Sequence, residues 1–367
     1  MLEMSVFLCG AVVMVIELTG SRVLAPYLGT SLVVWTSLIG IILASLSLGY
    51  WWGGRVADRR PEARLLGQII LLAAFSTAAI ALTKSLVLGF FQAQGFVDRD
   101  TPYNRVIVFK GADNDTGRLM RVMVTGPHAR QSAMYLDDPS ALALPYTRYF
   151  RLAEHFVPQM KRMLVLGGGG FSFPKYALAH YPDVRVDVVE LDPGVTTLAR
   201  DYFELKDHPR QRIIAEDART FLNRNGEAYD AILCDTFNSH YAIPFHLTTL
   251  EAAQRMHAAL ASNGVVLVNL LSALSGERSH LFHAVFATYK RVFPRVLAFA
   301  VRNTQDGSSW QNIILAAFAS PDEPLLADPD PDMAAMLARR LDIPAAAEVA
   351  PLTDDYAPVD RYIMSAW

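Results

Sequence analysis

Residues 162–190 read RMLVLGGGGFSFPKYALAHYPDVRVDVVE, and this stretch decides the fold. An apolar run, Arg162 to Leu166, ends in a cluster of glycines, Gly167 to Gly170. A segment of helical character, Phe173 to His180, and a valine-rich run, Val184 to Glu190, follow it. Nearly continuous apolar strands that alternate with helices are typical of a parallel sheet covered on both faces. The stretch therefore predicts a strand–helix–strand unit.

The same alternation continues toward the C-terminus. Further strands are expected at 212–215, 231–235 and 264–270, and further helices at 196–203, 218–224 and 246–260. Two last strands, at 296–301 and 311–317, are expected to close the sheet with an antiparallel edge. The sequence thus predicts an α/β fold with a Rossmann-like, mostly parallel sheet over residues 144–319.

Two smaller parts flank this sheet. Short strands at 104–110, 118–124 and 132–136 predict a small β unit over residues 98–143, and a helix at 144–156 opens the Rossmann-like part. The segment 320–367 is rich in Pro, Asp and Ala, with one expected helix at 332–341. We expect this tail to pack near the site.

The first 95 residues differ in composition from the rest. Of the 367 residues, 52% are hydrophobic and only 19% are charged, against roughly a quarter in an average soluble domain. Uncharged runs of 24 residues at 31–54 and 19 residues at 65–83 each qualify alone as a membrane helix, which needs about 20 apolar residues. A run at 5–16 reaches this length only by continuing past Glu17 and Arg22. We therefore expect about three transmembrane helices and contact with a lipid bilayer.

Two other interpretations of this region were weighed. Two membrane helices with one interfacial helix are the alternative arrangement. A signal peptide is the alternative for the first run, but that run has no basic n-region and no small-x-small cleavage site.

Charge and cysteine content exclude several classes of function. The net charge of −3 and the pI near 6.3 provide no basic surface for nucleic acid. Cys9 and Cys234 lie far apart in apolar runs, where thiols act as small hydrophobic side chains. We therefore expect neither a disulfide framework nor a metal site.

Four features stand at the expected carboxyl ends of strands, where such sheets bind their ligands. The glycine cluster permits a tight turn and a close approach of backbone amides to a ligand. Glu190 ends the second strand, where a carboxylate can accept the hydroxyls of a ribose. Asp217 follows the third strand and can meet an adenine amino group, and Asp235 ends the fourth. Structural alternatives are a helix N-cap for Asp217, a surface carboxylate for Glu190 and a turn residue for Asp235.

Several segments occur in an order that resembles a known family. They are TPYN at 101–104, GGG at 167–169, VELD at 189–192, EDA at 216–218 and YDAILCD at 229–235. From residue 101 to about residue 300 the chain resembles spermidine synthase, the polyamine aminopropyltransferase family. The segments IPFHLTT at 243–249 and LTDDYAPV at 352–359 are more similar to the membrane-bound branch of that family.

The resemblance implies a fold, a reaction and roles for particular residues. It implies a sheet like that of S-adenosylmethionine-dependent methyltransferases, and transfer of an aminopropyl group from decarboxylated S-adenosylmethionine to an amine. Asp235 would be the catalytic base. The nucleoside would be held by Gly167, Gly168, Gly169, Glu190, Asp217 and Asp235, and the amine by Tyr103, Asn104, Tyr146 and Asn238. No metal is implied, and a homodimer stays open.

Some residues depart from the family pattern. Gly170 and Phe171 replace an Asp-Gly pair, Asn238 replaces a second acid, and Asn104 stands where Gln is usual. An Asp-Glu pair is missing before Tyr146. These changes remove negative charge that would hold a diamine, although Asp137, Asp138, Asp354 and Asp355 could replace it. Two alternatives therefore stay open: a methyltransferase that uses S-adenosylmethionine on an unknown acceptor, and a non-catalytic, membrane-tethered nucleoside-binding module.

The location follows from two arguments that disagree. A nucleoside co-substrate is cytosolic, so we expect a multi-pass protein of the inner membrane whose catalytic domain is cytoplasmic. The loop at 55–64 carries Arg55, Arg59, Arg60 and Arg64, which by the positive-inside rule places that loop in the cytoplasm. With three spans, this rule places the catalytic domain on the opposite side.

Overall fold

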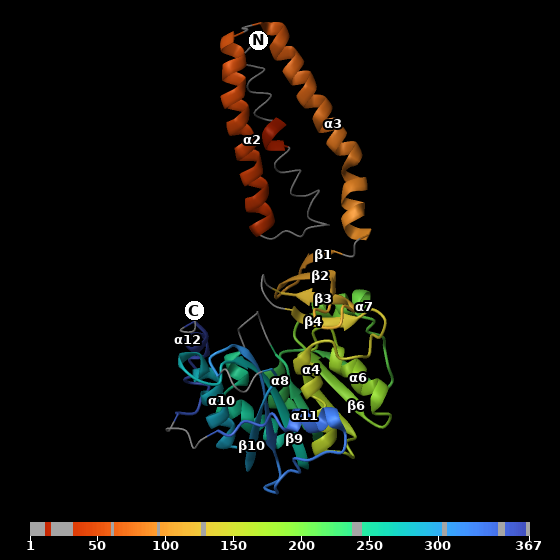
Figure 1. Ribbon diagram of the computed structural model, residues 1–367, viewed down its shortest axis with the longest axis vertical. Coiled ribbons are helices and arrows are strands. Elements are labelled where there is room, and N and C mark those ends of the chain that lie inside the picture. The colour runs from red at the N-terminus through yellow and green to blue at the C-terminus, as the bar shows by residue number, and fades with distance from the viewer. Residues whose placement is uncertain are drawn as a thin grey trace. The chain divides into compact units, whose positions relative to one another are not determined.

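The computed structural model describes residues 12–15, 32–59, 62–93, 96–125, 130–236, 244–302, 307–343 and 349–364. The chain divides into two compact units (Figure 1). The first contains Met1–Asp100 and Arg105–Lys110, and the second contains Thr101–Asn104 and Gly111–Trp367.

Two long helices dominate the first unit: α2, Leu32–Arg59, and α3, Ala63–Ala93. Among the described residues, one stretch, Thr36–Val56 in α2, is long and apolar enough to cross a membrane. The apolar part of α3, Arg64–Ile80, is shorter. The first expected span lies outside the described residues except for 12–15, so the set of three membrane helices stays a prediction.

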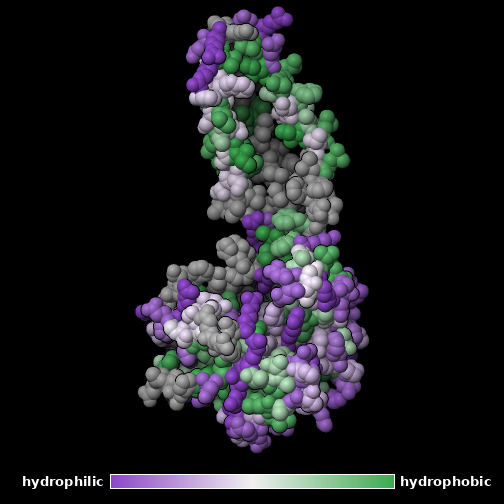
Figure 2. Space-filling view, in the orientation of Figure 1, coloured by the Kyte–Doolittle hydropathy of each residue, from purple (hydrophilic) through white to green (hydrophobic). Residues whose placement is uncertain are grey.

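The surfaces of α2 and α3 are apolar along most of the described helices (Figure 2). Leu48 and Trp52 in α2 are 66% and 70% exposed, and Phe75 and Leu82 in α3 are 72% and 78% exposed. Hydroxyl groups in both helices donate to the carbonyl four residues earlier, as Ser45 does to Ile41. Such bonds satisfy polar side chains without water.

Short antiparallel strands follow α3 in the sequence. In the first unit β1, Val97–Asp100, pairs with β2, Arg105–Ala112. In the second unit β3, Leu119–Val124, pairs with β4, Arg130–Tyr135. The three strands expected from the sequence are present, and β1 is additional. Its sequence, VDRD, has no apolar alternation that would predict it.

The second unit contains a seven-stranded sheet in the order β10-β11-β9-β8-β5-β6-β7 (Figure 1). The parallel strands are β5, Arg162–Leu166; β6, Arg185–Glu190; β7, Gln211–Ala215; β8, Tyr229–Cys234; and β9, Leu260–Ser272. The antiparallel edge is β11, Gln311–Phe318, with β10, Arg295–Ala300. This confirms the predicted Rossmann-like sheet and its antiparallel edge.

Helices cover both faces of the sheet. They are α4, Pro145–Tyr149; α5, Leu152–Phe156; α6, Ser172–His180; α7, Pro193–Tyr202; α8, Ala218–Arg224; α9, Leu250–Ala258; α10, His280–Lys290; α11, Pro331–Leu337; and α12, Val359–Met364. Two 3-10 turns, η1 at Phe245–Leu247 and η2 at Glu277–Ser279, precede α9 and α10. Helices α8, α9, α10 and α12 share one buried apolar cluster with the sheet residues Leu166, Cys234 and Val268. The buried Cys234 confirms its role as a small hydrophobic side chain, and Cys9 lies outside the described residues.

The structure corrects several helix boundaries. The helix expected at 144–156 is two short helices. Between them the backbone hydrogen bonds join residues three apart instead of four: the Phe150 amide donates to the Thr147 carbonyl, and the Ala153 amide donates to the Phe150 carbonyl. Helix α7 begins earlier than expected, since Asp192 caps it and Pro193 stands in its first turn. The helix expected at 246–260 splits into η1 and α9, where Thr249 is the N-cap.

Candidate active site

The glycine loop packs directly on the end of β8. Gly167 has φ +94°, and a Cβ added there would lie 2.3 Å from the carbonyl oxygen of Asp235. A larger residue would therefore be strained and would clash with backbone. The Gly170 amide donates to the hydroxyl of Ser132 on β4, at 2.8 Å. These contacts hold the loop against the carboxyl ends of β5 and β8.

Glu190, at the end of β6, faces this loop. One carboxylate oxygen, Oε2, accepts the Gly168 and Gly169 amides at 2.7 and 3.1 Å. The other, Oε1, accepts the Asp192 amide at 2.9 Å. Burial raises the pKa of Glu190 above its usual value, and the three amide bonds oppose this shift.

Asp235 is held between two side chains at the end of β8. The Tyr146 hydroxyl donates to Asp235 Oδ2 at 3.1 Å, and Asn269 Nδ2 donates to Oδ1 at 2.8 Å. Asn312 Nδ2 in turn donates to Asn269 Oδ1 at 3.0 Å, which fixes the orientation of the Asn269 amide. Burial raises the pKa of Asp235 to about 6, against the lowering effect of both donors. Burial and the nearby Asp235 carboxylate hold the pKa of Tyr146 well above its usual value.

The two carboxylate oxygens of Asp217, which follows β7, have different partners. Its Oδ1 accepts the Thr220 amide at 2.8 Å and caps α8, as the helix-cap interpretation predicted. Its Oδ2 lies 3.3 Å from Nε2 of His246 in η1. Burial alone would raise the pKa of Asp217, but the Thr220 amide and His246 lower it overall.

Two other sequence-predicted substrate residues, Tyr103 and Asn104, lie in a turn beside the start of α7. Tyr103 is 55% exposed and belongs to the turn at 101–104, in which the Thr101 amide donates to the carbonyl of Asn104 at 2.7 Å. The Thr101 hydroxyl also donates to Asp192, which ties the turn to the start of α7. Asn238 lies outside the described residues.

Sequence reasoning missed the two amides behind Asp235. Asn269 is 3% exposed within the apolar strand β9, and its partner Asn312 stands on β11. Asn269 is a polar residue within an apolar strand, and a buried amide needs a hydrogen-bond partner. This pattern could have predicted that Asn269 binds another polar side chain.

Two of the proposed replacement acids are already paired. Asp137 binds Arg118 at 2.8 Å, and Asp354 binds Arg219 at 2.6 Å. Asp138 accepts from Ser140 in its own turn. Arginine thus compensates the charge of Asp137 and of Asp354. Among the residues that the structure describes, no group of three or more His, Cys, Asp or Glu side chains could hold a metal ion.

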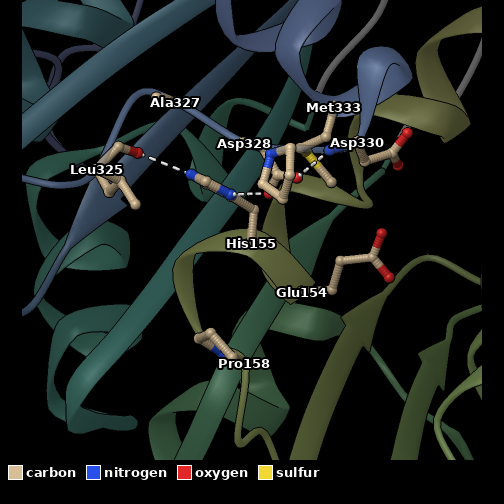
Figure 3. Close-up of a pocket in the computed structure, with 9 residues that line it drawn as sticks. Glu154, His155, Pro158, Leu325, Ala327, Asp328, Asp330 and Met333 are labelled. Atoms are coloured by element: carbon tan, nitrogen blue, oxygen red, sulfur yellow. Dashed lines mark hydrogen bonds and ion pairs between the residues drawn. The ribbon is translucent and has the colours of Figure 1, made fainter.

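A separate pocket of about 410 Å³ lies between α5 and the tail segment that leads into α11 (Figure 3). His155 Nδ1 lies 2.6 Å from Asp328, and Nε2 lies 2.7 Å from the Leu325 carbonyl oxygen. Arg151 joins Glu154 and Asp330, at 2.9 and 3.0 Å. Because these acids are paired, their contacts attach this part of the tail to α5. The residues that line this pocket include neither Asp235 nor the glycine loop.

Comparison with known proteins identifies the family. Residues 149–317 match the spermine/spermidine synthase domain. A polyamine aminopropyltransferase of Vibrio vulnificus is 31% identical over 222 residues, which cover 59% of this chain and 70% of that protein. The chain belongs to the spermidine synthase family. Like other members of the spermidine synthase family, it is a transferase.

Two further matches concern the fold and its relatives. The crystal structure of a probable spermidine synthase from Corynebacterium glutamicum superposes with a TM-score of 0.53 at 26% identity, covering 61% of this chain and 80% of that one. An N-terminal histidine N-methyltransferase of Emericella nidulans is 30% identical over 209 residues, or 54% of this chain. The match spans only 36% of that protein. The chain is thus similar in sequence to a methyltransferase as well as to aminopropyltransferases.

Proposed function

We propose that this protein is a membrane-anchored aminopropyltransferase that uses decarboxylated S-adenosylmethionine and a polyamine or related amine. The observation that carries the proposal is Asp235, a carboxylate held by Tyr146 and Asn269 where the glycine loop meets β8. With its pKa raised to about 6, it is ionised at neutral pH yet a stronger base than an ordinary aspartate.

Asp235 accepts the proton in this reaction. The amine nitrogen of the acceptor attacks the aminopropyl carbon bound to the sulfonium, and a C–N bond forms as the C–S bond breaks. The sulfur keeps the electron pair and leaves as neutral methylthioadenosine. The proton lost by the nitrogen passes to Asp235, and Tyr146 and Asn269 fix the carboxylate for this transfer.

Glu190 and Asp217 hold the nucleoside in this proposal. A carboxylate offers about four acceptor positions, and three backbone amides occupy three of those of Glu190. The fourth position can accept one ribose hydroxyl. A second ribose hydroxyl binds by displacing one of the loop amides. Asp217 Oδ2 meets the adenine amino group, since Oδ1 already caps α8.

The apolar helices support the membrane anchor. Thr36–Val56 is long enough to span a bilayer, and the exposed side chains of α2 and α3 would otherwise present a large apolar surface to water.

A methyltransferase is the second candidate, because a curated methyltransferase matches more than half of the chain. The deciding experiment incubates the full-length protein, in detergent, with S-adenosylmethionine or its decarboxylated form and a panel of amines. Methylthioadenosine formed only from the decarboxylated donor is expected. S-adenosylhomocysteine formed from S-adenosylmethionine would establish the methyltransferase instead.

A further inference from the structure

The tail segment at 352–359 packs against α9 and α10. The Leu250 amide donates to the Leu352 carbonyl at 2.8 Å, and the Leu352 amide donates to Thr288 Oγ1 at 2.9 Å. Leu352 itself is 2% exposed. These bonds fix the position of Asp354, two residues later.

Asp354 makes a forked ion pair with Arg219 of α8. Arg219 donates through both terminal nitrogens, at 2.6 and 3.2 Å, and the hydroxyl of Thr249 donates to Asp354 Oδ1 at 2.7 Å. The Asp354 side chain is 43% exposed, whereas that of Arg219 is 14% exposed. The Arg219 guanidinium is therefore the less exposed partner of this contact.

Arg219 also reaches the segment next to the nucleoside end of the site. It donates to the carbonyl oxygen of His246 at 2.8 Å. The imidazole of His246 lies 3.3 Å from Asp217 Oδ2, the oxygen that does not cap α8. A continuous series of contacts therefore runs from Asp354 in the tail to the acid at the end of β7.

We propose that Asp354, Arg219 and His246 are positioning residues that set the side chain of Asp217 for adenine, so that the tail completes the nucleoside site. The inference rests on the proposed function. Without His246 as donor, Asp217 keeps its contacts with Thr220 but loses the donor to Oδ2. Without Asp354, the partly buried Arg219 loses its ionised partner and holds the His246 backbone less firmly.

The test measures the affinity of the full-length protein, in detergent, for methylthioadenosine by calorimetry. Asp354→Asn and Arg219→Lys should each weaken binding about three- to tenfold, since the net contribution of one typical hydrogen bond is about that factor. Lysine keeps the charge of Arg219 but cannot make the fork. The matched control is Asp355→Asn, which removes an exposed neighbouring carboxylate and should leave affinity within about twofold.

A second pair of variants separates positioning from general stability. His246→Leu should weaken nucleoside binding, and His246→Gln should restore most of it, because the glutamine amide can donate from a similar place. Unchanged affinity in Asp354→Asn and His246→Leu would overturn the inference, as would equal loss in the Asp355→Asn control. The wild-type protein is measured in the same assay. If the wild type does not bind methylthioadenosine, the proposed function fails; if it binds and the variants bind equally well, only this inference is overturned.

Discussion

The carboxylate of Asp235 gives the enzyme its expected pH dependence. Its pKa is raised to about 6 by burial, so the base is protonated and inactive below that pH. We expect kcat to fall about tenfold per pH unit below about pH 6, as measured in steady-state assays at saturating amine. Asn269→Leu removes a hydrogen-bond donor that stabilises the ionised form of Asp235. The pKa of Asp235 should rise, and the fall in kcat should begin at a higher pH. A flat profile between about pH 5 and pH 7 would contradict the assignment.

The same group sets a balance between activity and stability. Because the pKa of Asp235 is higher in the folded protein than the ordinary value of 3.8, the ionised side chain opposes folding above about pH 6. Asp235→Asn should therefore abolish turnover and raise the stability of the domain at pH 7.5, by at most about 3 kcal/mol. Thermal unfolding at pH 7.5 and at pH 4 checks this, since the gain should shrink at the lower pH. A melting temperature of Asp235→Asn below that of the wild type at both pH values would show that the ionised Asp235 does not destabilise the fold.

Asn238 stands where the family keeps a second carboxylate, and a neutral amide offers no charge to a diamine. Putrescine should bind the wild type weakly, and Asn238→Asp should lower its KM by roughly tenfold, the effect of one charged hydrogen bond. Initial rates with putrescine and decarboxylated S-adenosylmethionine measure this. If the wild type is inactive and the variant gains nothing, the diamine is not the acceptor.

At the scale of elements, the turn between β5 and α6 depends on Gly167. Gly167→Ala places a methyl group 2.3 Å from the Asp235 carbonyl oxygen in a left-handed backbone conformation. We expect the free energy of unfolding to fall by about 2–4 kcal/mol, measured by denaturant unfolding. We also expect weaker nucleoside binding, measured by calorimetry. Gly226→Ala is the matched control, because an added Cβ there meets nothing within 4 Å. Equal effects of both substitutions would contradict this role of the turn.

The sequence predicted those strands and helices whose own residues show a clear apolar pattern. The strands around Leu164 and Val188 are continuous apolar runs, so their place in a buried parallel sheet follows from local pattern. Helix α10 was not expected, and its N-cap, Ser279, makes no side-chain cap bond. Asp235 was predicted as a site residue because it follows a strand within a recognisable motif, and its catalytic role stays a prediction. The Asn269–Asn312 contact joins positions 43 residues apart, which no local pattern reveals.

At the scale of the whole molecule, the helices α2 and α3 should keep the full-length protein in the membrane. Their exposed apolar side chains and internally bonded hydroxyls suit a bilayer rather than water. Alkaline carbonate extraction of membranes should leave the chain in the pellet, and detergent should release it. Release by carbonate alone would show that the helices do not span the bilayer.

The position of β11 has a consequence for synthesis. It lies between β9 and β10, although β10 comes earlier in the chain. While the ribosome is still making residues 311–318, the five parallel strands have an open edge at β9, and Asn269 has no Asn312 to orient it. Asp235 is therefore translated before its support, and a nascent chain that ends before β11 holds Glu190, Asp217 and Asp235 without the two amides that orient Asp235.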